Sequence, residues 1–524
     1  MKQFRFLLYL LCFTLCNNES SGQILVPGSY DIDYYKVLQL QNNDLVDPIN
    51  FRPSIITQYR IDSSLTWDIW ENRFPIFQEE KEGLNFFWNY PSMTISFDSK
   101  YPRGYNDGAI WSGKGLMTSL TGGVYGNIGI LHFAFNPIYS YAQNNHFEIP
   151  SHNFNKSEYS YPFENDIDWV QRYGDQAYHN FNLGQSELRL IYKKTTIGIS
   201  TENMVWGPAQ FNPILMSNNA AGIPRIDLGS SEPIKTKIGN IEFRAFWGVI
   251  KESNFFEKFE EKHERYWTGF TFGYQPSFIP GLSLGINRTM YKDHTLFPME
   301  AKDIFWAFRI NPEDDPGSVN DFYDQMVSGT LRWTFIEVGF ETYVELAKND
   351  FNDGLLDHLL EPDHSRSYTI GFIKTLNLKS GNILKLNYEH TTLGKSRFSR
   401  STPPIYVHYV AKQGYTHEGQ IIGSDIGPGS NSDYVSVNWY SPSGMIGFVS
   451  SRIRFNDDYY ESNYESSDFF DQQDVEYNLT ISALKFINRF SIGGKLGISQ
   501  RLNWNYESGN NVNNFHVSCS LSYR

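Results

Sequence analysis

The sequence predicts an all-β protein, a transmembrane antiparallel β-barrel of about 18 strands. The first observation is a two-residue alternation of apolar and polar side chains, which is clear at residues 241–249, 330–335 and 515–523. The second is the length of the alternating segments, about 10 residues, which suits a tilted strand that crosses a membrane. The third is that short turns alternate with long polar loops along the chain.

The polar faces of these segments distinguish two all-β architectures. They carry charges of both signs, as at Glu187 and Arg189, and such charges suit a hydrated lumen in which acids and bases pair. Aromatic residues such as Tyr440 and Trp504 stand at strand ends, where the aromatic girdle of a membrane barrel lies. A soluble β-sandwich is the alternative, since it also buries one apolar face of each strand.

The turn pattern leaves one interval unresolved. Short turns are predicted at Gly126-Asn127, Lys193-Lys194, residues 441–444 and Ile487-Asn488. A strand count that starts from the first strand and one that starts from the C-terminal strand disagree by one strand, and this parity conflict lies between residues 204 and 237. Because a barrel with both ends in the periplasm needs an even number of strands, we expect either one further strand in this interval or a segment that folds back through the lumen.

Composition limits the possible functions. The 524 residues carry 44 Lys+Arg and 58 Asp+Glu, a formal net charge of −14, so no nucleic acid is expected as a partner. The 3 cysteines provide neither a disulfide framework nor a Cys-rich metal site. The sequence HEGQI at 417–421 lacks the second histidine of a zinc protease motif. We therefore predict a protein that is not an enzyme, with no catalytic residue, no metal and no cofactor.

The N-terminal region is predicted to contain three parts. Residues 1–22 resemble a secretory signal peptide, with Lys2 and Arg5 before an apolar run, and we expect cleavage near Gly22 and residence in the cell outer membrane, surrounded by lipid. Residues 23–90 are predicted to form a periplasmic or lumenal segment with short helices, one capped by Ser29 and one weakly helical at 68–82. Residues 91–524 are predicted to form the barrel.

Residues 206–227, WGPAQFNPILMSNNAAGIPRID, are too irregular for a strand and too apolar for a mobile loop. Two interpretations are open. The segment plugs the lumen, with Trp206, Asn218, Asn219 and Arg225 as plug residues, or it shapes a ligand path in which the two asparagines and the arginine donate hydrogen bonds.

Two predicted outer loops combine aromatic rings with polar groups, as sugar binding requires, because a sugar offers an apolar C–H face beside its hydroxyls. The loop at 143–183 contains Trp169, Arg172 and Tyr173, and its two aromatic rings share one face if residues 168–173 form a helical turn. The loop at 457–474 contains seven acidic residues. Its candidate binding residues are Tyr459, Tyr460 and Tyr464.

The two loops differ in charge. The 457–474 loop contains no basic residue and repels an anionic polymer unless a cation bridges them; an ordinary acidic surface loop is the alternative. The loop with Trp169 therefore ranks first.

Three stretches occur in the order and spacing of a known family. They are NDGAIWSGKG at 106–115, the WGP…SNNA…P segment from Trp206, and HEGQIIGSDIGPGSNSDYVSVNWY at 417–440. In these stretches the sequence resembles the capsule assembly Wzi family of Gram-negative outer membranes.

The resemblance implies an outer-membrane barrel of about 18 strands with a small helical element at the periplasmic side. It also implies a lectin-like, non-catalytic role in binding or organising capsular polysaccharide or exopolysaccharide at the cell surface, with polysaccharide export machinery as a further partner. A channel for sugars or other small solutes is the alternative function.

Overall fold

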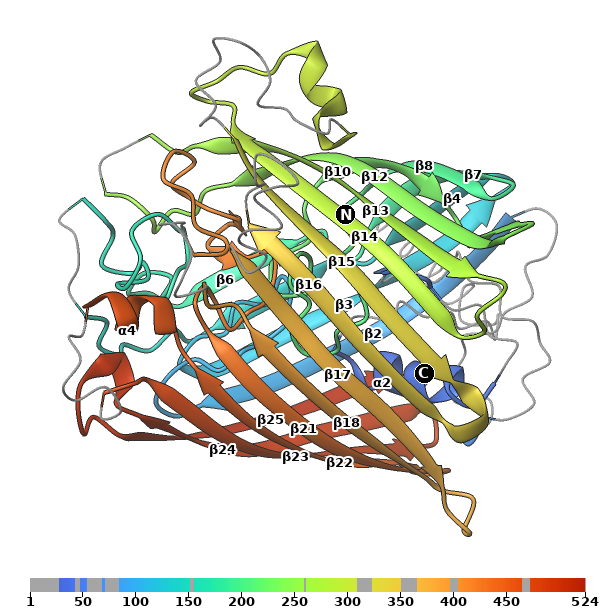
Figure 1. Ribbon diagram of the computed structural model, residues 1–524. Coiled ribbons are helices and arrows are strands. Elements are labelled where there is room, and N and C mark those ends of the chain that lie inside the picture. The colour runs from blue at the N-terminus through green and yellow to red at the C-terminus, as the bar shows by residue number, and fades with distance from the viewer. Residues whose placement is uncertain are drawn as a thin grey trace, which may run out of the picture.

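The computed structural model describes residues 28–42, 48–53, 68–70, 84–150, 155–258, 261–308, 323–349, 365–395, 404–463 and 472–523. Within these ranges the strands close into an antiparallel barrel of 18 strands (Figure 1). The predicted fold class is confirmed, and the β-sandwich alternative is excluded. None of the helices in the described ranges is long and apolar enough to span a membrane.

The wall contains these strands in chain order: β2 (Leu84–Asp98), β3 (Gly115–Ile128), β4 (Leu131–Phe135), β5 (Ile138–Ala142), β6 (Tyr178–Asn182), β7 (Glu187–Tyr192), β8 (Thr195–Ser200), β10 (Arg225–Ser230), β11 (Ile234–Thr236), β12 (Gly239–Lys251), β13 (Glu264–Pro276), β14 (Leu282–Asp293), β15 (Tyr323–Phe335), β16 (Phe340–Asn349), β17 (Arg366–Asn377), β18 (Ile383–Thr392), β21 (Asn431–Ser441), β22 (Gly444–Arg454), β23 (Val475–Ile487), β24 (Phe490–Leu502) and β25 (Val512–Tyr523). The pairs β4 with β5, β6 with β7, and β10 with β11 each fill one position in the wall. The barrel closes through β2, which pairs with both β25 and β3.

The remaining elements lie inside the barrel or at its ends, except η2, which packs against the outer side of β12 and β13. They are α2 (Tyr30–Gln39), β1 (Phe51–Pro53), β9 (Met204–Trp206), η2 (Ala301–Phe308), η4 (Ile336–Val338), β19 (Thr416–His417), β20 (Gln420–Ile421), α4 (Asp457–Asn463) and η5 (Trp504–Tyr506). The short strands β1 and β9 pair with each other and not with the wall.

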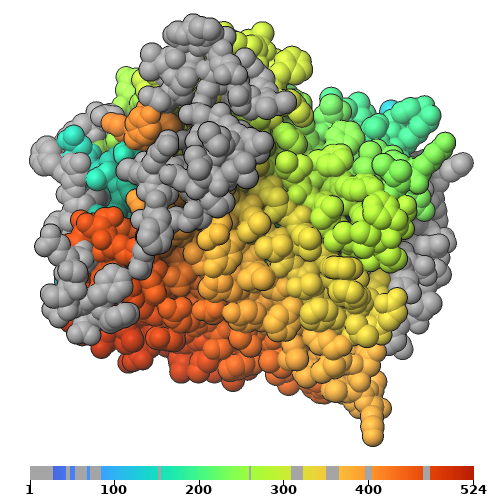
Figure 2. Space-filling view, viewed as in Figure 1, coloured from blue at the N-terminus to red at the C-terminus, as the bar shows by residue number. Residues whose placement is uncertain are grey.

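The outer face of the wall is apolar and exposed. On β23, Ile481 is 55 % exposed, whereas Asn478 and Ser482 on the opposite face are buried. Where they are visible in Figure 2, the strands β15 to β18, yellow to orange, present a closed surface of side chains. The two-residue alternation thus separates a lipid-facing exterior from a polar interior.

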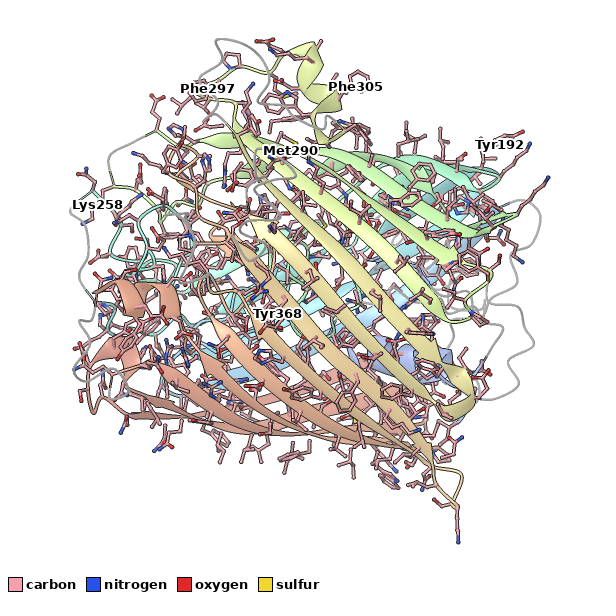
Figure 3. The ribbon with its side chains drawn as sticks, in the orientation of Figure 1. Tyr192, Lys258, Met290, Phe297, Phe305 and Tyr368 are labelled. Carbon is pink, nitrogen blue, oxygen red and sulfur yellow. The ribbon has the colours of Figure 1, made fainter. Side chains whose placement is uncertain are left out.

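The two ends of the barrel differ. One end carries the short connections, such as those after β7, β17, β21 and β23, and is called the short-turn end; the other is the long-loop end (Figure 1). The exposed Tyr192 marks the short-turn end at the tip of β7 (Figure 3). In outer-membrane barrels the short turns face the periplasm and the long loops face the exterior.

One predicted turn is wrong. Turns follow β7, β21 and β23 as expected, but Gly126-Asn127 lies inside β3, and the chain reverses at Gly129-Ile130. A Cβ atom at Gly126 would lie 2.0 Å from the carbonyl oxygen of Asn85 on β2. The glycine therefore marks a close approach of two strands and not a reversal.

The helix α2 closes the short-turn end. The Ser29 side chain accepts a hydrogen bond from the Ile32 backbone N–H at 3.3 Å, as the predicted cap requires. The ring of Tyr34 stacks on Trp70 with centroids 3.8 Å apart, and both pack against strand-end residues that include Tyr440. A small helical element at the periplasmic side is confirmed.

Part of the predicted N-terminal region lies outside the described residues, and the wall begins earlier than predicted. The proposed signal peptide lies outside the described residues, as does most of the predicted helix at 68–82. The wall begins at Leu84 and not at residue 91, because β2 continues across Pro91 through an irregularity between Asn89 and Ser92.

The centre of the barrel is filled. A buried apolar cluster contains residues of 204–223 and 405–426, such as Trp206, Ile214 and Tyr406. It also contains inward-facing residues of the wall, such as Trp267. The parity conflict between residues 204 and 237 arises from both of the predicted causes, a further strand and a segment that folds into the lumen. The strand β10 is the additional crossing, paired with β8 and β12, and the chain before it folds into the lumen. We call residues 204–223 together with 404–430 the lumen segments.

Inward-facing charges of the wall bind the backbone of the lumen. Glu389 on β18 accepts hydrogen bonds from the backbone N–H groups of residues 210, 211 and 212 at 2.6, 3.0 and 2.6 Å. Glu242 on β12 does the same for residues 49, 50 and 51, each at 3.1 Å. Arg265 on β13 donates to the carbonyl oxygen of Thr416 at 3.0 Å. These inward-facing charges therefore satisfy buried backbone groups, whereas Glu187 and Arg189 pair with each other at 2.8 Å, as predicted.

Candidate functional site

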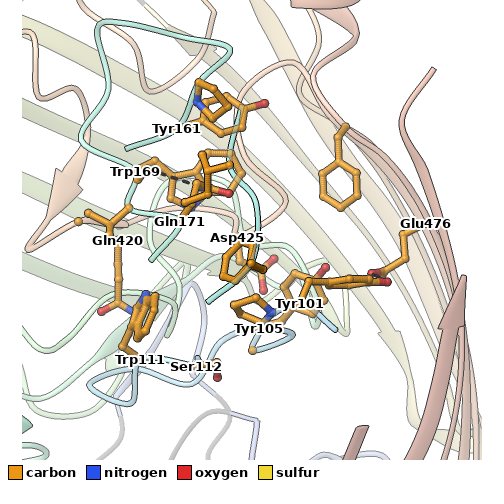
Figure 4. A pocket seen from close by; sticks show the side chains of 18 of the residues that line it. Tyr101, Tyr105, Trp111, Ser112, Tyr161, Trp169, Gln171, Gln420, Asp425 and Glu476 are labelled. Atoms are coloured by element: carbon orange, nitrogen blue, oxygen red, sulfur yellow. Dashed lines mark hydrogen bonds between the residues drawn. The ribbon is translucent and has the colours of Figure 1, made fainter. Parts of the chain in front are cut away.

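The long-loop end contains a cavity of about 160 Å³. Its lining comes from residues 101–112, 147–150, 161–171 and 419–425, and from the wall near η5 (Figure 4). Aromatic side chains form much of this lining, among them Tyr101, Tyr105, Trp111, Tyr161, Trp169 and Trp504. Flat apolar rings beside polar groups match the two faces of a sugar.

The lumen segments hold the cavity loops in place. The Asn218 amide donates to the carbonyl oxygen of Asn106 at 2.6 Å, and the Gly108 N–H donates to the carbonyl oxygen of Asn218 at 2.7 Å. Trp169 lies against Gly427, where a Cβ atom would approach the indole ring to 2.4 Å. Gly427 also has a φ of +84°, which favours glycine. The cavity is thus built on packed chain and not on free loops.

Some of the charges near the cavity are paired. Among the described residues that line it are four acids and one base: Asp107, Glu148, Asp425, Glu476 and Arg501. Glu476 accepts hydrogen bonds from the Tyr101 hydroxyl at 2.9 Å and from Arg103 Nε at 3.0 Å. Arg501 donates two hydrogen bonds to Asp474, at 2.6 and 2.8 Å.

Asp425 is buried without a hydrogen-bond partner in the part of the chain that the structure describes. Its side chain is 5 % exposed, and neither carboxylate oxygen accepts a hydrogen bond from the described residues. Burial, followed by the negative charge of Asp107, raises the pKa of Asp425 to about 8. Buried polar groups are normally paired, so an unpaired carboxyl group with a raised pKa marks a candidate functional residue.

The structure separates the predicted sugar-binding residues of the 143–183 loop. Trp169 lines the cavity, whereas Arg172 and Tyr173 do not. Arg172 is buried and donates to the carbonyl oxygen of Phe147 and to Asp175, both at 2.9 Å. Tyr173 is buried against Trp111 and donates its hydroxyl to the carbonyl oxygen of Glu418 at 2.7 Å.

The helical turn expected at residues 168–173, all of which the structure describes, is absent. Asp168 accepts two hydrogen bonds from Ser253, at 2.6 and 2.7 Å, and the Val170 N–H donates to the carbonyl oxygen of Gly419 at 2.9 Å. These distant partners hold the chain in an irregular path, so Trp169 and Tyr173 point to different surroundings.

Neither Tyr459 nor Tyr460 of the second loop lines the cavity. Tyr459 and Tyr460 belong to α4, where Tyr460 is buried and Tyr459 is half-buried beside Phe163. Tyr464 lies outside the described residues. The acids at the start of α4 are also held, since Asp457 accepts from Arg454 at 2.6 Å and Asp458 from the Lys395 N–H at 3.0 Å.

The predicted plug residues all lie buried in the lumen. Trp206 belongs to β9, and Asn219 donates to the carbonyl oxygen of Ile421 at 2.9 Å, which ties the two lumen segments together. Asn218 joins the first segment to the cavity loop. Arg225 differs, because it begins the wall strand β10 and points inward to the carbonyl oxygen of Glu202 at 2.7 Å.

Asp425 and Trp111 were missed as site residues. The signal was available, because Trp111 lies in NDGAIWSGKG and Asp425 in HEGQIIGSDIGPGS, two of the stretches that carry the family resemblance. A buried acid in a glycine-rich stretch has no recognisable pattern until its surroundings are known.

Comparisons with known proteins agree with the architecture. The family model for Capsule assembly protein Wzi matches residues 106–515. The chain belongs to the Wzi capsule assembly family. Both cavity segments that bear Trp111 and Asp425 fall within the matched range. No curated protein sequence matches the chain.

Among solved structures, Wzi of Escherichia coli resembles this Wzi-family chain with a TM-score of 0.61 and 10 % sequence identity, over 95 % of this chain and 99 % of that one. That protein is described as an outer membrane protein involved in group 1 capsule assembly and a carbohydrate-binding β-barrel. OccAB2 of Acinetobacter baumannii matches with a TM-score of 0.41 and 13 % identity, over 83 % of this chain and 98 % of that one.

Proposed function

We propose that this Wzi-family barrel holds surface polysaccharide in a lectin-like manner, at the aromatic cavity of its long-loop end. The observation that carries the proposal is the set of aromatic side chains around that cavity, at the end where outer-membrane barrels face the exterior. We further propose that the chain is exported, loses its signal peptide near Gly22 and resides in the outer membrane. Export machinery that delivers the polymer is a fitting partner.

Binding would combine two kinds of contact. Rings such as Trp169 and Trp504 offer apolar surfaces for the C–H face of a sugar, and the amides of Gln171 and Gln420 line the same cavity and offer hydrogen bonds to hydroxyls. Because the closed wall and packed lumen segments hold these groups, little conformational entropy is lost on binding.

The two buried acids of the cavity, Glu476 and Asp425, are poorly placed for glycoside hydrolysis. A glycosidase needs two carboxyl groups that reach the scissile bond. Glu476 is engaged by Tyr101 and Arg103, and both oxygens of Asp425 are shut off from solvent. We therefore expect no increase in reducing ends when the purified protein is incubated with polysaccharide from the same cells. Release of reducing ends that stops in Glu476→Gln would contradict this.

A channel for small solutes is the second candidate function. Lys495 on β24 favours it. Ile492 and Leu496 are exposed on the outer face of this strand, and Lys495, on the inner face, is exposed as well. The lumen is therefore hydrated on that side. The packed centre weighs against a wide pore, and planar bilayers should show no large, stable conductance. A large conductance in the intact protein would favour the channel.

Retention of polysaccharide on cells tests the main proposal. The double variant Trp169→Ala with Trp504→Ala should release polymer into the medium while the barrel still assembles. Trp439→Ala is the matched control, since this tryptophan lies on β21 near the short-turn end and is exposed on the outer face. Unchanged cell-bound polysaccharide in the double variant would overturn the proposal.

A further inference from the structure

The helix η2 lies outside the wall and turns an apolar side outward. Figure 3 shows Phe305 on η2, outside the wall strand that carries Met290, and the Phe305 side chain is 65 % exposed. The large apolar residues that are exposed on η2 and on the chain before it are Leu296, Met299, Ile304, Phe305 and Phe308. A helix on the surface of a protein in water normally turns its apolar side inward and its polar side outward.

The side of η2 that faces the wall is held by polar groups. Asp303 is buried, and its carboxylate accepts a hydrogen bond from Lys292 Nζ at 2.9 Å. The carbonyl oxygen of Asp303 accepts from the Tyr266 hydroxyl at 3.2 Å, and that of Ala307 accepts from Arg288 at 3.4 Å. The helix therefore covers polar side chains on the outer face of β13 and β14 and presents apolar side chains in their place.

An apolar solvent outside the wall explains this arrangement. Toward the short-turn end of β14 the outward side chains Leu284 and Ile286 are apolar and exposed without a cover. A basic side chain on the lipid-facing surface of a barrel is unfavourable at the depth of the acyl chains. Covering Arg288 and Lys292 with apolar side chains removes this cost in lipid, whereas in water it exposes apolar area to no benefit. The lipid-facing surface therefore continues from the wall onto η2.

The strands beside this region carry a pair of basic residues at the long-loop end. On the outer face of β16 and β17, Lys348 lies directly opposite Arg366 in the strand register. Like charges in this arrangement repel each other. Toward the short-turn end, the same faces carry the exposed apolar residues Leu346 and Ile370. The change from apolar to basic side chains fits the level of the lipid headgroups, where a phosphate group between the two cations would offset their repulsion.

We propose that η2 and the Lys348–Arg366 pair form a contact surface for phosphate-bearing lipids of the outer leaflet. The helix lies at the boundary between headgroups and acyl chains, and the two cations bind the phosphate. The two features are neighbours, because Trp306 of η2 packs against Tyr323 of β15 with ring centroids 5.1 Å apart, and β15 pairs with β16. This surface is separate from the glycan cavity, and its assignment rests only on the proposed residence in the outer membrane.

Quenching by lipid tests the position of η2. A fluorophore is attached to Phe305→Cys, Ile481→Cys or Glu507→Cys of the exported protein, with Cys519→Ser to remove the described free cysteine. The proteins are reconstituted into phosphatidylcholine vesicles with brominated acyl chains. Ile481 is exposed on the outer wall and Glu507 in the loop after β24, so they report lipid and water. We expect position 305 to lose fluorescence nearly as strongly as position 481, and position 507 to lose little.

The two controls separate the possible failures. Quenching at position 481 without quenching at position 305 would overturn the lipid contact of η2 and leave membrane residence standing. An absence of quenching at position 481 would contradict membrane residence itself.

Bound lipid tests the two cations. Lys348→Gln with Arg366→Gln should reduce several-fold the lipid A that native mass spectrometry detects on protein taken from vesicles of phosphatidylcholine and lipid A. Lys379→Gln is the matched control, since it removes an exposed cation from the turn after β17, and it should retain the lipid. Equal retention in the double variant would overturn the phosphate site. A protein dimer that Phe305→Ser abolishes would assign the surface to a second copy and overturn the lipid assignment.

Discussion

The lumen and the cavity at the long-loop end contain two groups of charges that are built in opposite ways. The first consists of three acids and three arginines: Glu187, Glu202, Asp227, Arg189, Arg225 and Arg244. Asp227 accepts from Arg189 at 2.5 Å and from Arg244 at 3.0 Å, and all three side chains are fully buried. The second group surrounds the cavity, where Asp107 and Asp425 have no cationic partner in the lining.

The difference separates a structural cluster from a binding site. In the first group positive and negative charges are equal in number, so the cluster joins β7, β10 and β12 and leaves no charge for a ligand. In the second group a buried carboxyl group is left unpaired, which destabilises the unliganded protein and is retained only where it serves another purpose. Changes in the first group should therefore affect stability, and changes in the second should affect binding.

The largest expected effect comes from Asp227→Ala. It leaves Arg189 and Arg244 buried without their shared partner, and such a break costs about 3–5 kcal/mol. Thermal unfolding in detergent, followed by circular dichroism, should show a large loss of stability. Asp425→Asn is the control and should not be destabilised at pH 7. Wild-type stability in Asp227→Ala would refute the structural role of this cluster.

The next effect concerns the attachment of the lumen segments. Glu389→Gln exchanges one acceptor oxygen for a donor, opposite three backbone N–H groups and the Tyr343 hydroxyl. We expect a loss of about 1–3 kcal/mol and faster proteolysis between residues 204 and 223. An unchanged cleavage pattern would show that apolar packing alone holds the segment.

Trp169→Ala should affect the other region. Removal of one aromatic surface should weaken polysaccharide binding roughly 10- to 30-fold, with little change in the unfolding temperature because the ring is only half-buried. Tyr173→Ala is the informative comparison, since Tyr173 is buried and contacts Trp111, so this variant should lose stability. A loss of binding with Tyr173→Phe equal to that with Trp169→Ala would contradict the assignment.

The last effect is a pH dependence, which is the smallest when it is measured over a single pH unit. Asp425 has a pKa of about 8 when folded and 3.8 as the ordinary value. The unfolded chain therefore loses this proton first, and stability should fall as pH rises from about 4 to about 8, by at most about 1.4 kcal/mol for each pH unit. Asp425→Asn should remove this slope. Parallel stability curves for variant and wild type between pH 5 and 8 would show that Asp425 is ionised in the folded protein.

The wall and the plug could be predicted from the sequence for different reasons. Alternation at 515–523 predicts β25 because neighbours along a strand face opposite sides whatever the rest of the chain does. The irregular apolar segment from Trp206 predicts burial by composition alone. Even the parity conflict was informative, since β10 and the segment before it both occupy the interval.

Only part of the cavity could be predicted from the sequence. Trp169 was found because an aromatic residue in an outer loop is a local signal. Its separation from Tyr173 was not, because Ser253 and Gly419, far along the chain, determine the local path. The absence of a partner for Asp425 has no local signal either. It depends on where Arg103 and Arg501 find their own acids, which only the closed barrel determines.

Hydrogen–deuterium exchange of the purified protein, with and without polysaccharide from the same cells, tests the central claim most directly. Bound polymer should slow exchange at residues 101–112, 161–171 and 419–425 and leave α2 and the short-turn end unchanged. Slower exchange confined to α4 or to the short-turn end, with the cavity segments unaffected at saturating polymer, would contradict the account.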